Sequence, residues 1–224
     1  MVRHPFKIGI TILFVIVLQG YVSHANALGQ AFYFVSGKIG SQETGQPAPL
    51  IGKADQYLDT IKADHGNLKD DRTVTPIGFG FDFYRVDGAL ATGFGLELNR
   101  YSKSYSFADR SSVQLDVQGV LFAFSTYYRG EFLFPYLALG TGGYSVKIRE
   151  KLVATSDEIS TTNASFIDAA PSVSYYEIGS RFPFGEWGLL TSWRATSAQL
   201  KIQTIGKRLE LGGQTIIFGV YYSY

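Results

Sequence analysis

The sequence predicts an all-β protein, an eight-stranded antiparallel up-and-down transmembrane β-barrel. Three observations lead to this prediction: apolar and polar residues alternate with a period of two in eight segments, the connections between segments alternate between short and long, and an export signal precedes them. The composition agrees, because 25 of the 224 residues are glycine and 15% are aromatic. Both proportions exceed the ordinary usage of soluble proteins.

The first 27 residues have the pattern of a signal peptide. Arg3 and Lys7 make a basic start, positions 8–18 are apolar, and the segment ends in Ala25-Asn26-Ala27, the small-x-small pattern that precedes cleavage. A membrane-anchor helix is the alternative, but the apolar run is shorter than the roughly 20 residues that a spanning helix needs. We therefore expect residues 1–27 to be removed and residues 28–224 to form the barrel domain.

The alternation is clearest in the last segment, where Ile216, Phe218 and Val220 share one face and smaller residues occupy the other. Such a pattern predicts a strand with two different environments. It recurs in five further segments and less regularly in two more, so that the predicted strands cover 32–39, 76–84, 90–99, 113–118, 133–142, 166–178, 187–196 and 215–224. In each regular strand we assign the apolar face to lipid and the smaller, more polar face to the barrel interior.

Connections of two kinds separate these strands. Short ones lie near 87–88, 129–130 and 182–186, and longer polar ones span about 41–72, 102–111, 149–162 and 199–208. Short turns at one end and long loops at the other are typical of outer-membrane barrels. Aromatic residues gather beside the short turns, and we expect Phe83, Tyr127, Phe184 and Trp187 to lie at the membrane interface. The alternative is a soluble barrel or sandwich with these aromatics in its core.

The polar faces of the predicted strands carry charged residues into the barrel interior. Because an unpaired ion in a low dielectric is costly, these residues should pair or keep water. Eight strands enclose a space that side chains can fill, so we expect a lumen plugged by a charge network; its predicted members are Lys38, Asp82, Glu97, Asp116, Asp168 and Arg194. A narrow gated ion path through the same residues is the alternative.

Three segments resemble the small eight-stranded outer-membrane barrels of Gram-negative bacteria, such as OmpA transmembrane domains and opacity-type surface proteins. They are FYFVSGKIGSQ at 32–42, FPYLALGTGGYS at 134–145, and the C-terminal pattern of Gly219, Tyr222 and Tyr224. Ile217 departs from the polar residue that usually precedes that glycine. The resemblance implies a monomeric, porin-like surface protein of the outer membrane, surrounded by outer-membrane lipid and lipopolysaccharide. It also implies that the barrel-assembly machinery reads the C-terminal pattern.

Several function classes are excluded or disfavoured. A formal net charge of +1 is not that of a strongly basic nucleic-acid binder. The chain has no cysteine, and the aspartates of the loop at 41–72 do not have the spacing of an EF-hand, so we expect neither a metal site nor a cofactor. That loop is predicted to be a solvated surface segment with a short helix at 53–63, and a ligand or partner contact is the alternative.

The sequence therefore predicts a structural or surface-interaction protein with long extracellular loops. A narrow channel or carrier for small or apolar solutes is the second hypothesis. The third is a lipid A-modifying enzyme, which would use His65 with Ser104, Ser106, Asp109 or Ser111. We disfavour an enzyme, because the chain has no Gly-x-Ser-x-Gly elbow and nothing in the sequence brings these residues within hydrogen-bond reach.

Overall fold

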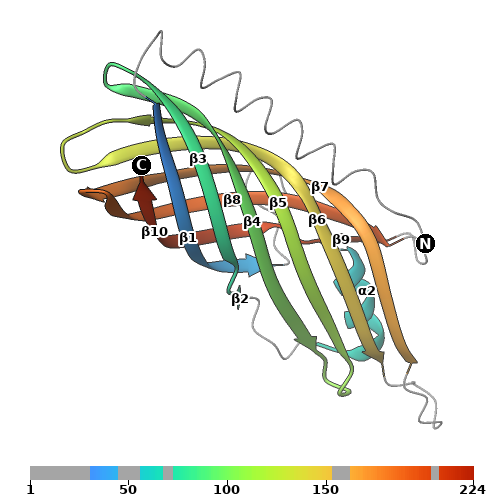
Figure 1. Cartoon of the computed structure of the whole chain (residues 1–224). Helices are drawn as coiled ribbons and strands as arrows, with labels where there is room; N and C mark the ends of the chain where they lie inside the picture. Colours follow the sequence, from blue (N-terminus) through green and yellow to red (C-terminus); the bar gives the residue numbers. More distant parts are fainter. Residues whose placement is uncertain (1–30, 45–55, 68–72, 153–161, 203–206) are drawn as a thin grey trace.

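Eight antiparallel strands form a closed barrel in the computed structural model (Figure 1). The structure describes residues 31–44, 56–67, 73–152, 162–202 and 207–224, and the predicted signal peptide lies outside them. Each strand pairs with its neighbour in the chain, and β10 closes the ring by pairing with both β8 and β1. The predicted fold class is therefore confirmed. The barrel strands are β1 (Ala31–Thr44), β3 (Ile77–Asp87), β4 (Leu90–Ser106), β5 (Ser112–Tyr128), β6 (Phe134–Leu152), β7 (Thr162–Phe184), β8 (Trp187–Ile202) and β10 (Gly213–Ser223).

Three short elements lie outside this ring. Strand β2 (Thr73–Val74) pairs with the end of β1, and β9 (Lys207–Glu210) pairs with the end of β8. Helix α2 (Gln56–His65) overlaps the predicted helix and lies beside β9 at one end of the barrel (Figure 1). In the described part of the chain, no helix is long and apolar enough to cross a membrane.

The two ends of the barrel differ in their connections. At one end, which we call the turn end, two-residue turns follow β3 and β7, and both begin with a glycine at positive φ, Gly88 at 61° and Gly185 at 73°. Such turns suit glycine, because the twist of a tight hairpin requires φ values that other residues adopt only with strain. Both chain termini of the described barrel lie here, since Tyr33 and Tyr224 exchange backbone hydrogen bonds. The opposite end, with α2 and the β4–β5 hairpin, is the loop end.

The outward and inward faces exchange polarity along the strands. On β5, the outward residues near the turn end are Val120, Phe122 and Phe124, which are 39–50% exposed. Toward the loop end, the outward positions become Gln114 and Asp116. The same change occurs on β4 after Leu98 and on β6 after Leu139. One apolar belt therefore surrounds the turn-end half of the barrel. Its outward members include Val35, Ile39, Ile77, Phe79, Leu90, Phe94, Leu98, Val120, Phe122, Phe124, Leu137, Leu139, Ile178, Leu189, Ile216, Phe218 and Val220.

The predicted loops are too long, because strand ends with a polar outer face were taken for polar connections. Strands β4, β6 and β8 continue through 102–106, 149–152 and 199–202, which were predicted to be polar connections. In the extension of β4, outward serines alternate with inward Tyr101, Lys103 and Tyr105, so the period of two continues while the outer face becomes polar. The β4–β5 connection is in fact only the hairpin at 107–111.

Strand β7 contains the irregularity that obscured its pattern. Its pairing with β6 shifts between Gly143 and Ser145, opposite the segment that contains Pro171. Proline cannot donate to the ladder, and a bulge is one of the few places where a strand tolerates it. Because a bulge changes which side of the sheet successive residues face, one alternation could not describe the whole strand, which runs over Thr162–Phe184 instead of the predicted 166–178.

Several inward glycines make room for tyrosine rings from neighbouring strands. A Cβ atom at Gly119 of β5 would lie 2.4 Å from Cδ1 of Tyr144 on β6. In the same way, Tyr175 lies over Gly140 and Tyr221 lies over Gly188. An aromatic side chain that covers a glycine on the adjacent strand stabilises the pair and fixes its register. The glycine-rich face of the sequence is thus filled by tyrosines that the neighbouring strands supply.

We predict that Gly119→Ala destabilises the barrel by about 1–3 kcal/mol, because the new methyl group overpacks against the Tyr144 ring. Gly37→Ala is the matched control, since a Cβ there meets no atom within 4 Å. Denaturant titration of the refolded barrel in micelles would measure both free energies of unfolding. Equal stabilities for the two variants would contradict the proposed close packing.

Candidate functional site in the barrel interior

Four charged side chains meet in the middle of the barrel interior: Lys38 of β1, Glu97 of β4, Glu177 of β7 and Arg194 of β8. We call them the central quartet. Arg194 donates two parallel hydrogen bonds to Glu97, from Nη1 to Oε1 and from Nη2 to Oε2, both at 2.7 Å. Lys38 Nζ lies 2.6 Å from Glu97 Oε2. Two cations thus face two anions at contact distance in a position that excludes most water.

Glu177 is held as tightly as Glu97. Arg194 Nε donates to its Oε2 at 2.7 Å, and the hydroxyls of Tyr136 and Ser192 donate to its Oε1 at 2.5 and 2.8 Å. The Arg194 guanidinium also lies 4.6 Å from the ring centroid of Tyr175. Removing charges from water is costly, and only good geometry with additional hydrogen bonds compensates for it. The quartet meets this requirement through bonds that come from five different strands.

A second buried ion pair lies toward the turn end. Arg181 Nη2 is 2.8 Å from Asp82 Oδ2 and 3.2 Å from the Tyr84 hydroxyl. Nε and Nη1 of Arg181 have no hydrogen-bond partner among the described atoms. Aromatic rings surround the guanidinium instead, with centroids 4.4–5.9 Å from its carbon, an arrangement that stabilises a cation through the faces of the rings. This aromatic cage consists of Phe34, Tyr84, Tyr127, Tyr136 and Tyr221.

The interior at the loop end is mainly apolar, although Lys103 and Glu210 are also buried there. Ile61 of α2 is buried in this cluster, so the helix covers the end of the barrel. The carboxylate of Glu210 is also buried there and accepts hydrogen bonds from the backbone N–H groups of Ala198 and Gly212, at 3.0 and 2.9 Å. Most of the cluster comes from the extended parts of β4, β5, β6 and β8, and it includes Tyr101, Tyr105, Phe107, Val113, Leu115, Val117, Tyr144, Val146, Ile148, Leu200, Leu209 and Leu211.

Two small spaces flank the central quartet. The first, of about 10 Å³, is lined by Asn99 and Tyr144 on the loop side, and the second, of about 20 Å³, is lined by Asp82 and Arg181 on the turn side. Each volume corresponds to about one water molecule. Layers of the interior are therefore closely packed on both sides of the quartet.

The structure places the predicted lumen residues in three ways. It brings Lys38, Glu97 and Arg194 together and turns Asp82 inward to Arg181. Asp116 was assigned to the lumen wrongly: it lies on the outer surface, where Arg149 Nη2 is 3.0 Å from its Oδ2. Its strand segment lies beyond the belt, where the inner face is apolar. The side chain of Asp168 lies outside what the structure describes.

The four aromatic residues predicted to lie at the membrane interface do not all face outward. Phe184 and Trp187 are outward and exposed by 66% and 61%. Tyr127 was assigned wrongly, because it is an inward member of the aromatic cage. Phe83 points outward but is buried, and its ring centroid lies 5.1 Å from that of Tyr33. Period-two alternation cannot separate inner from outer aromatics when both faces carry them, as at the turn end.

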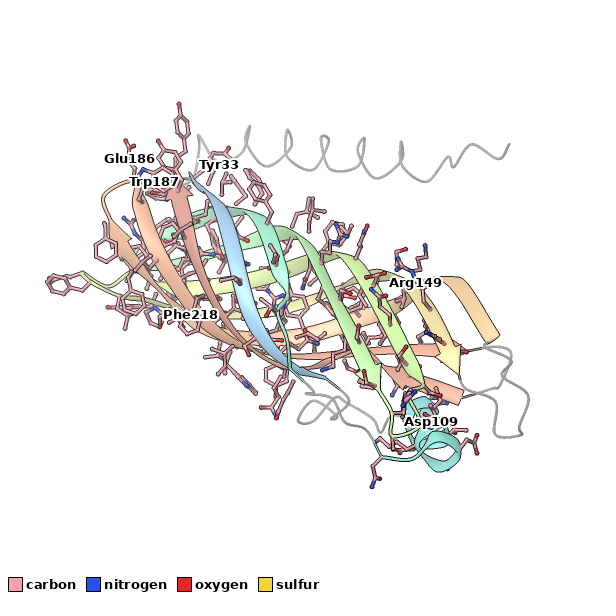
Figure 2. The ribbon with its side chains drawn as sticks, turned by 90° about the horizontal axis from the view of Figure 1, so that it is seen from below. Tyr33, Asp109, Arg149, Glu186, Trp187 and Phe218 are labelled. Carbon is pink, nitrogen blue, oxygen red and sulfur yellow. The ribbon has the colours of Figure 1, made fainter. Side chains whose placement is uncertain are left out.

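The C-terminal residues lie at the turn end, as Figure 2 shows for the neighbouring Glu186, Trp187 and Tyr33. The Tyr222 hydroxyl donates to Glu186 Oε2 at 3.0 Å. Tyr224 is 86% exposed, and Gly219 pairs with Lys38 of β1. These contacts close the barrel, and recognition of the C-terminal pattern by an assembly machinery stays a prediction.

Sequence reasoning missed Glu177 and Arg181. Both lie on the inward face of β7 with Tyr175, in a stretch where the residues alternate regularly. Restarting the alternation after Pro171 would have found them. The side chain of His65 lies outside the described set, and Asp109 accepts hydrogen bonds from the backbone N–H and hydroxyl of Ser111, which stabilise the hairpin. Within the described ranges, no three histidine or acidic side chains converge as a metal site requires.

We predict that Arg194→Met destabilises the barrel by about 3–5 kcal/mol, because it leaves Glu97 and Glu177 buried without their shared cation. Arg149→Met removes an ion pair on the outer surface and should cost less than about 1 kcal/mol. Free energies of unfolding in the same micelles would provide the comparison. Similar losses in the free energy of unfolding for the two variants would show that the quartet is as solvated as the surface pair.

Comparisons with known proteins supply no family assignment. No protein-family model matches the chain, and no curated protein matches it in sequence. Among solved structures, it is similar to Ail, the attachment invasion locus protein of Yersinia pestis, in complex with the heparin analogue sucrose octasulfate (13% identity, 88% of this chain and 100% of that chain, TM-score 0.43). It is also similar to Neisserial surface protein A (10% identity, 86% of this chain and 98% of that chain, TM-score 0.48). A third similar structure is the N-terminal β-barrel domain of Pseudomonas aeruginosa OprF (13% identity, 88% of this chain and 99% of that chain, TM-score 0.41). The fold assignment therefore depends on the strand pairing of this chain itself.

Proposed function

We propose that the chain is an outer-membrane barrel with a sealed interior and a structural or surface-interaction role, exercised at its loop end. The observation that carries this proposal is the apolar belt. Its outward residues on β4 run from Leu90 to Leu98, a segment close to the 9–11 residues that a tilted strand needs to cross a bilayer. A water-soluble barrel would not leave Phe79, Phe218 and many similar side chains more than half exposed on one continuous surface.

The predicted signal peptide and the alternating connections support export and an orientation with the loop end outside. The inward charges and the outward apolar residues occur at the same level of the barrel, which is the arrangement expected in lipid. Beyond the belt, polar outward residues and an apolar interior are the arrangement expected in water. The chain thus carries a lipid-facing half and a water-facing half, and the water-facing half is available for contacts at the cell surface.

The central quartet supports a sealed interior over the channel hypothesis. Arg194 spans from Glu97 to Glu177, and Lys38 occupies the remaining side of Glu97. Above and below, the flanking spaces hold about one water molecule each. A conducting state would need these ion pairs to separate inside a low dielectric, which is unfavourable unless water replaces each bond.

We predict that Phe94→Lys, in the middle of the belt, destabilises the membrane-inserted barrel by about 2–4 kcal/mol, because a lysine at that depth must leave water. Ser104→Lys, outward on the same strand but beyond the belt, should change stability by less than about 0.5 kcal/mol. Heat-modifiability gels of the membrane fraction and urea titration in vesicles would measure both. A chain that migrates identically with and without boiling, in a soluble fraction, would contradict the membrane assignment.

We also predict that the purified barrel shows no large, stable conductance in planar bilayers, because the quartet and the aromatic cage fill its interior. A general porin in the same bilayers would provide the positive control. Stable openings of porin size by this chain would reject the sealed interior and favour the channel hypothesis.

A further inference from the structure

The seam between β1 and β10 closes the barrel, and the two strands lie side by side (Figure 1). They come from the two ends of the described chain, so no turn joins them. Eleven residue pairs form the seam, from Phe34 with Ser223 to Thr44 with Gly213. In a hairpin the turn fixes the register, whereas here only contacts made by the strands themselves can fix it.

The outward face of the seam does not specify the register. Ile39 of β1 lies opposite Phe218 of β10, and both belong to the apolar belt. A slip by two residues would place Ile39 opposite Ile216 or Val220, which are also apolar, outward and about half exposed. Because side chains alternate with a period of two, such a slip keeps every residue on its own face. The outward face therefore accepts the three registers equally well.

The inner face of the seam contains a contact that only glycine permits. A Cβ atom at Gly40 would lie 2.8 Å from Cγ2 of the buried Thr215 and 3.0 Å from Cγ of Pro76. The backbone N–H of Gly40 donates to the Pro76 carbonyl at 2.8 Å, which holds this part of β1 in place. A residue with a side chain would therefore be overpacked beneath Thr215.

A slip in either direction replaces Gly40 beneath Thr215. One direction brings Gln42 to that position, and the other brings Lys38. Both residues carry a Cβ atom, so both slipped registers are overpacked. The long side chains of Arg194 and Glu97 discriminate less sharply, because their rotamer freedom lets them follow a shift of the backbone.

A hydrogen bond at the loop end also favours the observed register. Gln42 Nε2 donates to the carbonyl of the buried Leu211, just before β10, at 3.2 Å. The Tyr101 hydroxyl of β4 donates to the same oxygen at 2.6 Å. A slip by two residues would move Gln42 by about 7 Å along the strand. The carbonyl would then lose this donor, and a buried polar group that loses a partner is costly.

We propose that the contact of Gly40 with Thr215, together with the hydrogen bond from Gln42 to Leu211, selects the register in which β1 and β10 close the barrel. The inner face of this seam thus does what a tight turn does between β3 and β4. This inference goes beyond the proposed function and does not depend on it, because the seam has to close in any solvent.

Cross-linking can test this proposal, because the chain has no cysteine of its own. Ile39→Cys is combined separately with Phe218→Cys for the observed register, and with Ile216→Cys or Val220→Cys for the two slipped registers. Residues directly opposite each other can form a disulfide, whereas diagonal neighbours, about 7–8 Å apart, cannot. Each pair is oxidised after refolding in micelles, and the yield is measured in the folded, heat-modifiable band.

Two variants change the contact from opposite sides. Gly40→Ala places a methyl group beneath Thr215 in the observed register, and Thr215→Ser removes the methyl group that excludes the slipped registers. We expect each variant to lower the ratio of observed to slipped cross-links about tenfold. Gly37→Ala is the matched control on the same strand, since a Cβ there meets no atom within 4 Å. Its ratio should stay within about twofold of the parent.

The outcomes are distinguishable. A parent-like ratio in Thr215→Ser would overturn the inference, because a threonine that only fills space would not affect the register. If Gly40→Ala does not fold, Thr215→Ser decides alone, since it deletes a single methyl group. Equal yields of the three cross-links in the parent would also overturn the inference. A parent that folds in micelles but does not insert into vesicles would instead contradict the proposed function, and the register would still be read in micelles.

Discussion

Closing eight strands into a ring leaves an interior only as wide as the side chains that point into it, and every other feature of this molecule follows from how that space is filled. Charged side chains occupy it at the level where the outer face is apolar. They are tolerated because Arg194 contacts both Glu97 and Glu177, and Arg181 contacts Asp82. The three cations and three anions of these layers balance each other, so no net charge is left in the low dielectric.

The exchange of polarity along the strands shows how one continuous sheet serves two solvents. In the belt, apolar residues face outward and the interior holds ion pairs and tyrosines that cover glycines. Beyond it, serines and charged residues face outward, and an interior cluster that includes Leu115 and Ile148 resembles the core of a water-soluble barrel. Helix α2 completes that core with Ile61. The boundary between the two halves is where a headgroup layer would lie.

Position relative to this boundary decides what each charge can do. Glu97 and Arg194 lie within the belt, where a charge without a partner would be costly, so they contribute to closure and rigidity. Arg149 and Asp116 lie beyond it, where water screens their pair, so that this pair contributes little to stability. The aromatic cage around Arg181 fills the turn end of the same interior, so that polar and aromatic layers succeed each other along the barrel axis.

The sequence by itself determined the all-β class, the strand number and the turn end, because period-two alternation and the glycines of tight turns depend only on neighbouring residues. It also identified Lys38, Glu97 and Arg194 as inward. Only the tertiary structure decided where the belt ends, since alternation has the same period on both sides of that boundary. For this reason Asp116 was assigned to the wrong face. Tyr127 was assigned wrongly because both faces carry aromatic residues at the turn end, and Glu177 and Arg181 were missed because the alternation restarts after the bulge of β7.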